Sequence, residues 1–169
     1  GQELAYLESV IDSVNRADGY TELAEIRDEL YGQGYLKRAK NDKAKKIKPL
    51  APLEYVSDDG YTILVGRNNI QNDILTFKTA AKDDSWFHTQ KIPGSHVVVV
   101  GNGDIIPERT CRQAAMLAAY HSSGRESSQV AVDYTEVRAL KKPTGAKPGK
   151  VIYHTYNTMW VTPDRETCE

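Results

Sequence analysis

A run of polar side chains between Gly66 and Asp73 stands where an expected strand gives way to an expected helix. Unpaired N–H groups at a helix start attract anions, and an arginine in the run adds a planar fork that suits phosphate. Asparagine and glutamine amides can in addition read base edges or sugar hydroxyls. In the alternative interpretation, Asn68 or Asn69 only caps the helix and Asp73 braces the turn. The candidate contacts from this stretch are Arg67, Asn68, Asn69, Asn72, Asp73 and, further along the same helix, Lys78.

A tryptophan and a histidine lie two residues apart, at Trp86 and His88, on an expected strand. Because side chains alternate along a strand, the two share one face. Ser95 and His96 lie on the strand that is expected to pair with it. If exposed, Trp86 and His88 could stack on an unpaired base or a terminal adenosine. If buried, they belong to the core, and the sequence leaves both interpretations open.

Residues 141–150 form a loop that carries four lysines and is stiffened by proline and glycine. Its glycine spacing is one short of a nucleotide-binding P-loop, and Val151 stands where that motif has serine or threonine, so this motif is excluded. Lysines on an extended loop suit a nucleic-acid backbone, although a merely solvated loop is the alternative. The candidate phosphate contacts are Lys141, Lys142, Lys147 and Lys150.

Catalytic and metal sites are difficult to assemble from the remaining residues. Zinc could be imagined among His88, His96, His121 and His154, but no cysteine or carboxylate stands at the usual ligand spacing. Neither of the motifs G-x-S-x-G and H-E-x-x-H occurs. We therefore expect no enzyme activity, no metal and no cofactor. The enzymatic alternative is an RNA-cleaving or RNA-modifying site that uses His88, His96 and Asp73.

The net charge of −1 hides a segregation of charge along the chain. Residues 1–31 carry eight acids against two arginines, whereas residues 32–50 carry seven bases against a single acid. A phosphate backbone responds to such local charge and not to the total. Cys111 and Cys168 lie far apart, and no apolar run approaches the length of a membrane span. These features predict a cytoplasmic protein with no membrane partner.

The elements that must position these residues follow from the hydrophobic periodicity. Leu4, Leu7, Ile11 and Val14 predict a helix with a coiled-coil or hairpin seam, which is interrupted at 17–19. A second helix is expected to resume with Leu23, Ile26 and Leu30 and to end at Gly32 or Gly34. The later period is mostly strand-like, and we expect hairpins at 53–65, 85–100 and 151–162 and a strand at 130–134. A helix is expected from 68 or 69 to about 81, with Ile70, Ile74 and Phe77 inward. Another helix is expected from 107 to about 123, with its alanines against the sheet.

These expectations define an α+β fold, with a mainly antiparallel sheet and packed helices, preceded by a short helical segment. We divide the chain into the end of a coiled-coil arm (residues 1–36), a basic linker (37–52) and a domain (53–169). Two heptads of seam cannot stand alone in water, so the arm is expected either to pack on the domain or to belong to a longer arm. The chain is interpreted as the C-terminal end of a larger protein.

Read in order, five sequence blocks resemble the NFACT-R domain, the C-terminal module of the NFACT family. The blocks are V-G-R-N-N-I-Q-N-D at 65–73, D-S-W-F-H at 84–88, P-G-S-H-V-V-V at 93–99, A-A-M-L-A-A-Y-H-S at 114–122 and K-K-P-T-G-A-K-P-G-K-V at 141–151. Residues 137–140 are looser than the family pattern, and residues 1–36 resemble the end of the family's coiled-coil arm.

The resemblance implies an RNA-binding module of a ribosome-associated quality-control factor. Such a factor would contact tRNA or rRNA on stalled large ribosomal subunits while an alanine tail is added to the nascent chain. The expected partners are tRNA or rRNA, the large ribosomal subunit and the rest of the parent NFACT protein. Some family members are described as fibronectin- or fibrinogen-binding, so a fragment of a surface adhesin is the alternative function.

Overall fold

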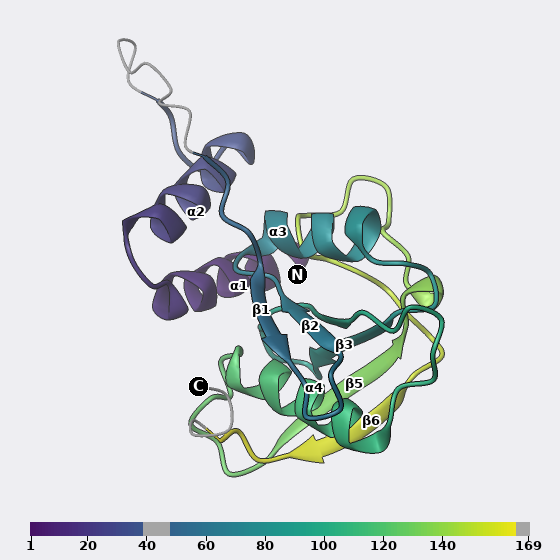
Figure 1. The fold of residues 1–169 in the computed structure, drawn as a ribbon. Coiled ribbons are helices and arrows are strands. Elements are labelled where there is room, and N and C mark those ends of the chain that lie inside the picture. Colours follow the sequence, from purple (N-terminus) through teal and green to yellow (C-terminus); the bar gives the residue numbers. More distant parts are fainter. Residues whose placement is uncertain (39–47, 165–169) are drawn as a thin grey trace.

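The computed structural model describes residues 1–38 and 48–164. Most of the expected basic linker (37–52) and Cys168 lie outside the described residues. Twelve elements follow along the described chain (Figure 1): α1 (Gln2–Arg16), α2 (Tyr20–Gly32), β1 (Leu53–Val56), β2 (Thr62–Val65), α3 (Asn69–Ile74), the π-helical turn η1 (Leu75–Thr79), β3 (Ser85–Thr89), β4 (Val97–Val99), α4 (Glu108–Tyr120), β5 (Val130–Glu136), the 3-10 turn η2 (Val137–Ala139) and β6 (Asn157–Val161).

The described strands form one six-stranded sheet in the order β1-β2-β4-β3-β5-β6, and every neighbouring pair is antiparallel. Two connections pass over the sheet, because β4 separates β2 from β3 and β3 separates β4 from β5. The first passes through α3 and the second through α4, and the two helices lie on opposite faces of the sheet (Figure 1). The expected α+β class with an antiparallel sheet is confirmed.

The last expected hairpin, 151–162, is wrong. Only its second half forms a strand, and this strand, β6, pairs with β5 from Val130↔Val161 to Tyr134↔Asn157. The first half contributes an isolated bridge between Lys141 and Ile152. The physical reason is Asp133 on β5, a buried carboxylate that accepts hydrogen bonds from Tyr153 Oη at 2.7 Å and Thr158 Oγ1 at 2.8 Å. Both halves therefore contact β5 and do not pair with each other.

The interior face of α3 also differs from the expected one. Ile70 and Ile74 are exposed, whereas Asn69, Asn72 and Thr76 are buried. These three positions are spaced by three and four residues, so they line one side of the helix. The inward side of α3 and η1 is therefore partly polar, and these side chains hydrogen-bond to the groups described below. The helix then passes into the π-helical turn η1, which places Leu75 in the core.

The two expected arm helices are confirmed as α1 and α2, with Gly19 at φ +93° between them. The expected seam is partly wrong, because Leu4 is 60% and Ile11 59% exposed. Tyr6 and Val10 pack instead against Ile26 of α2 and form a small apolar cluster within the arm. The spacing of the apolar residues therefore predicted the helix correctly but did not predict which side of it packs against α2.

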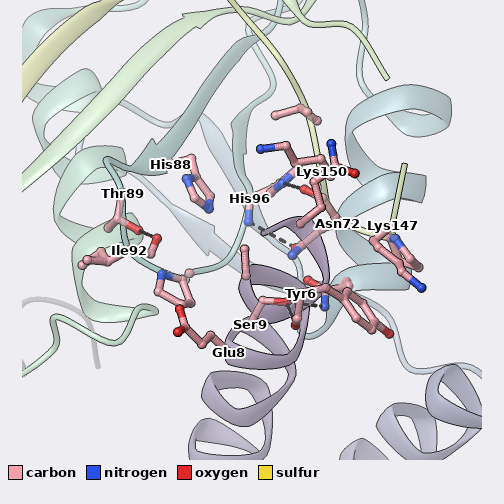
Figure 2. A pocket seen from close by; sticks show the side chains of 18 of the residues that line it. Tyr6, Glu8, Ser9, Asn72, His88, Thr89, Ile92, His96, Lys147 and Lys150 are labelled. Atoms are coloured by element: carbon pink, nitrogen blue, oxygen red, sulfur yellow. Dashed lines mark hydrogen bonds between the residues drawn. The ribbon is translucent and has the colours of Figure 1, made fainter. Parts of the chain in front are cut away.

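The arm lies against the domain, where Arg16 and Ser9 of α1 hydrogen-bond to Ser95 and Asn69. Figure 2 shows Tyr6 and Ser9 of α1 on one side, facing Asn72 and His96 of the domain on the other. The sequence left open whether the arm packs on the domain, and the structure shows that it does.

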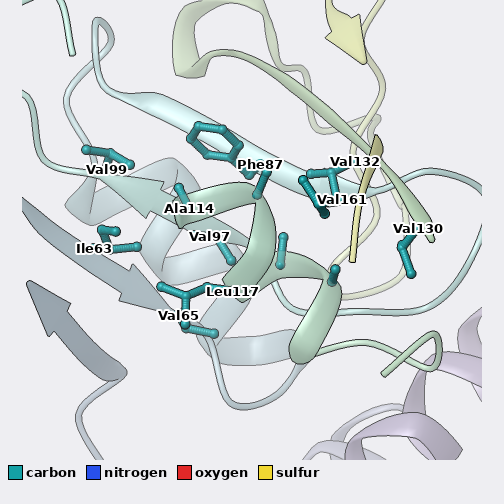
Figure 3. Close-up of a cluster of buried hydrophobic side chains, with 13 residues drawn as sticks. Ile63, Val65, Phe87, Val97, Val99, Ala114, Leu117, Val130, Val132 and Val161 are labelled. Atoms are coloured by element: carbon teal, nitrogen blue, oxygen red, sulfur yellow. The ribbon is translucent and has the colours of Figure 1, made fainter. Parts of the chain in front are cut away.

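The main core lies between the sheet and α4 (Figure 3). Phe87, Val97 and Val99 project from the sheet onto the helix, where Ala114 and Ala118 are fully buried. Alanines lack the bulk that would hold the helix away, so α4 approaches the strands closely, as expected from the sequence. A second cluster, on the opposite face, contains Leu75, Trp86, Val98, Val137 and Leu140. The candidate site is built on this second face.

Candidate nucleic-acid interface

The polar junction (residues 66–73) is bonded to the arm by three glutamates of α2. Arg67 forms an ion pair with Glu22. Asn68 Nδ2 donates to Glu25 at 3.0 Å, and Asn69 Nδ2 donates to Glu29 at 3.2 Å. The glutamates are spaced by three and four residues, so they share one side of α2. The junction thus joins the arm to the domain.

Asn68 also caps α3, because its Oδ1 accepts from the backbone N–H of Gln71 at 2.9 Å. The expected capping role is confirmed. Asn68 and Asn69 are buried. Burial raises the pKa of Glu29, although hydrogen bonds from Tyr6 and Asn69 oppose the shift. Direct RNA contacts by Arg67, Asn68 and Asn69 stay predictions, and these side chains are occupied by the arm.

Asn72 and His96 form the next layer of the site. The backbone N–H of His96 donates to Asn72 Oδ1 at 3.1 Å. The ring of His96 lies between Thr76 Oγ1, 2.8 Å from Nδ1, and the carbonyl of Gly149, 3.0 Å from Nε2. A carbonyl only accepts, so the ring proton lies on Nε2 and Nδ1 accepts from Thr76. Burial holds the pKa of His96 well below its usual range, which keeps the ring neutral.

The lysine loop (residues 141–150) is held in place by Asp73 at the end of the junction. Asp73 Oδ1 accepts from Lys142 Nζ at 3.1 Å and from the backbone N–H of Gly149 at 3.0 Å. Lys142 Nζ also donates to the carbonyl of Lys147 at 2.6 Å. Burial raises the pKa of Asp73, and Lys142 opposes that shift. Both hydrogen bonds of Lys142 therefore help to hold the loop in this conformation.

The loop comes close to the junction at Gly149. Its φ is +83°, and a Cβ placed on it would lie 2.5 Å from Oδ1 of Asn69. Both facts favour glycine, because other residues rarely adopt this backbone conformation and a Cβ here would force the side chain of Asn69 to move.

The other lysines of the site are less constrained. Lys141 and Lys150 are exposed on the loop, and Lys78 is exposed on η1. Lys147 places its ammonium 5.5 Å from the ring centre of Tyr6 and 5.2 Å from that of Tyr35, so it bridges the loop to the arm through cation–π contacts. The loop is thus an ordered part of the domain that leaves Lys141 and Lys150 facing solvent.

Trp86 is fully buried, so the core interpretation applies to it and direct stacking on a base is excluded in this conformation. Its ring stacks on His88 at 5.7 Å, with an angle of 8° between the planes. The rings of His96 and Tyr153 meet it edge-on at 5.2 Å. His88 is only partly buried and lines a pocket. The two residues share one face, as expected, but differ in access.

The pocket has a volume of about 380 Å³ and lies where the arm meets the domain (Figure 2). Its floor includes His88 from β3 and His96, the residue before β4, and α1 forms a wall with Tyr6 and Ser9. The lysine loop and the turn between β3 and β4 complete it. We call it the arm–domain pocket.

The remaining candidates are dispersed. Ser95 is buried and accepts from Arg16 of α1 at 3.1 Å. His121 lies 2.9 Å from the Tyr55 hydroxyl, and His154 is exposed elsewhere. In residues 1–38 and 48–164, no group of His, Cys, Asp or Glu side chains is arranged to hold a metal ion. No helix in the same ranges is long and apolar enough to cross a membrane.

Sequence reasoning missed the arm's share of the site. Tyr6 and Tyr35 meet Lys147, and Glu22 meets Arg67, across long sequence separations. The spacing of the glutamates of α2 was a usable signal for a polar face with a partner. Lys91 also lines the pocket, but no pattern in the sequence pointed to it. Its positive φ of 60° is known only from the structure.

Comparison with protein families divides the chain at a point between arm and domain. Residues 52–155 match the NFACT protein RNA-binding domain, and residues 1–49 match the NFACT N-terminal and middle domains. The arm–domain pocket is lined from both regions, for example by Tyr6 and His88.

Similar proteins point the same way. The chain is 51% identical over 163 residues to the Rqc2 homolog RqcH of Streptococcus pneumoniae and 45% identical over 168 residues to that of Bacillus subtilis, covering 95% and 98% of this chain. It spans only 29% of the length of each of these curated relatives. A solved structure of the C-terminal part of the fibronectin/fibrinogen-binding protein from Streptococcus suis matches with a TM-score of 0.91 at 46% identity, covering 99% of this chain and 66% of that one. The chain belongs to the NFACT family, and its residues 52–155 correspond to the family's RNA-binding domain.

Proposed function

We propose that this chain is the RNA-contacting end of a ribosome-associated quality-control factor, and that RNA phosphates bind along the lysine loop. The observation that supports the proposal is that hydrogen bonds hold this loop in a defined conformation. Asp73 and His96 hold its backbone, and the ammonium groups of Lys141 and Lys150 stay exposed. A loop that is ordered before binding loses less conformational entropy when a phosphate backbone arrives.

The family match and the relatives named Rqc2 homolog RqcH support this proposal. The RNA we propose is tRNA or rRNA of a stalled large ribosomal subunit, contacted during addition of an alanine tail, in the cytoplasm. The chain spans less than a third of those relatives, so tailing would require the rest of the parent protein. We propose a binding role without catalysis, because His96 and Asp73 are both engaged in holding the lysine loop.

The test is a filter-binding titration with tRNA at several salt concentrations. Reversing both exposed lysines (Lys141→Glu with Lys150→Glu) is expected to weaken binding and to lower the salt slope by about one per lysine. Lys142 is unsuitable for this test, because its loss would also disturb Asp73. The double reversal Lys82→Glu with Arg112→Glu, at two exposed residues outside the loop, changes the net charge by the same amount and is the matched control. Equal affinity of the loop variant and this control would defeat the proposal.

The likeness to a fibronectin/fibrinogen-binding protein favours a second candidate, an adhesive role. Binding of the purified chain to immobilised fibronectin, together with detection of the parent protein on intact cells, would support it. If neither is found while tRNA binds, the adhesive role is excluded.

A further inference from the structure

The arm–domain pocket has an interior that carries no charge. Its floor is formed by His88 and His96, and burial lowers the pKa of both rings. Aromatic rings of Tyr6 and Tyr153 line it as well. A volume of about 380 Å³ lies in the range of pockets for small ligands. Such an interior suits a flat, neutral group and would reject a charged one.

Its rim is basic. Lys91 comes from the turn between β3 and β4, and Lys147 and Lys150 come from the lysine loop, against a single acid, Glu8, among the described residues that line the pocket. Lys91 is held at φ +60°, a conformation that glycine would adopt more easily. A lysine kept there at a conformational cost points to a use for its side chain.

A neutral aromatic interior with a rim of ammonium groups matches the two halves of a nucleotide. We propose that the arm–domain pocket takes one unpaired nucleotide of an RNA, with the base inside and its phosphate at the lysine rim. This assignment rests on the proposed RNA-binding function and names a site within it. Because Tyr6 and Ser9 of α1 form one wall, the pocket requires the arm as well as the domain.

The experiment compares two RNA hairpins that differ in one base. One carries a single unpaired adenosine at its 3′ end, and the other carries an abasic ribose at that position, so their charges are equal. The 169-residue chain is expected to bind the adenosine-ended hairpin about tenfold more tightly, which is the size of a single stacking contact.

Two variants of α1 locate the effect. Ala5 lines the pocket, and its side chain makes no hydrogen bond that could be lost, so Ala5→Phe fills the space. Leu4→Phe adds a ring on the same helix at a residue that does not line the pocket and is 60% exposed. The preference for adenosine should disappear in Ala5→Phe and persist in Leu4→Phe. Binding of the abasic hairpin should be equal in both variants.

A third variant, Lys91→Gly, tests the rim. Glycine adopts positive φ without strain, so the unfolding midpoint should not fall, while affinity for both hairpins should decrease. Unchanged affinity in Lys91→Gly would overturn the role of the rim.

Equal binding of the two hairpins by the unaltered chain, or a preference that survives in Ala5→Phe, would overturn the pocket while leaving RNA binding intact. Failure to bind either hairpin would instead count against the proposed function itself. AMP serves as a competitor, and AMP that binds as tightly as the hairpin would show that the ligand is a free nucleotide, which also overturns the assignment to RNA.

Discussion

The ring of His96 donates from Nε2 to the carbonyl of Gly149, 3.0 Å away, and so joins the start of β4 to the lysine loop. Lys150, one of the two loop lysines that stay exposed, is the next residue. The same ring receives a hydrogen bond from Thr76 on η1. One buried side chain therefore sets the position of the proposed phosphate contact relative to two other elements.

Replacing this ring should loosen the loop. His96→Ala removes both side-chain hydrogen bonds and leaves a cavity, so the free energy of unfolding should fall by about 2–4 kcal/mol. Urea unfolding measures the loss, and limited proteolysis should cut first within residues 141–150. His154→Ala, at an exposed histidine, is the control and should change stability by less than about 0.5 kcal/mol. A similar small effect in His96→Ala would contradict the role assigned to the ring.

Stability should fall as the pH falls below neutrality. Burial lowers the pKa of His88 and His96, and it lowers that of His121 to about 3, with Arg16 adding to the shift. Unfolded histidines titrate near 6.5, so the unfolded chain binds protons that the folded chain refuses. The stabilisation is complete above pH 6.5 and is lost as the pH falls toward the folded pKa values.

His96 and His121, whose pKa values lie far below that of an unfolded histidine, predict a loss of about 3 kcal/mol between pH 7.5 and 5.5, and His88 adds to it; urea unfolding across that range measures the loss. Glu29 and Asp73 act in the opposite direction, because their raised pKa values favour the folded state as they take up protons at lower pH. His121→Phe should remove up to about half of the loss. A stability that does not change with pH over this interval would sink the prediction.

The ion pair between Arg67 and Glu22 should contribute measurably, because both side chains are largely buried. A double-mutant cycle with Arg67→Met and Glu22→Gln is expected to give a coupling energy of about 1 kcal/mol or more. The exposed pair Arg138–Glu136 is the matched comparison and should give a value near zero. The prediction would be refuted by indistinguishable coupling energies in the two cycles.

Two glycines in the lysine loop allow the backbone strain caused by an added Cβ to be measured apart from its steric clash. Gly145 and Gly149 both have positive φ, but only at Gly149 would a Cβ meet another atom within 4 Å. Gly145→Ala should therefore cost about 1 kcal/mol of backbone strain. Gly149→Ala should cost clearly more and should shift Asn69, which thermal unfolding and the amide NMR signals of Asn69 would report. Equal losses in the two variants would argue against the close approach.

Local pattern was sufficient to predict much of this fold. The alanines of α4 indicated close packing on a sheet, and the break at Gly19 separated two helices. The failures came from contacts between distant residues. Nothing near Asn157 predicts that Asp133 will draw its strand onto β5, and nothing near Ile70 shows that the inward side of α3 is polar because the groups it faces are polar.

The candidate site was found from residue types but not from their geometry. Type and order alone suggested Asn69 and Trp86 as ligand contacts, yet both are buried and make internal contacts. Lys141 and Lys142 are adjacent and identical in type, and only the structure separates an exposed side chain from one bonded to Asp73. Exposure depends on packing over the whole chain, and no local pattern encodes it.

Carboxylates join the arm to the domain, and they determine which kind of surface would be exposed if the two separated. The arm keeps its own apolar cluster of Tyr6, Val10 and Ile26, and the surfaces in contact at the junction consist largely of acids, amides and an arginine. Water can solvate such groups on both sides, so separating them would expose little apolar area. Because these groups are largely buried and paired, the hydrogen bonds and the ion pair, and not apolar contact, are what resist that separation.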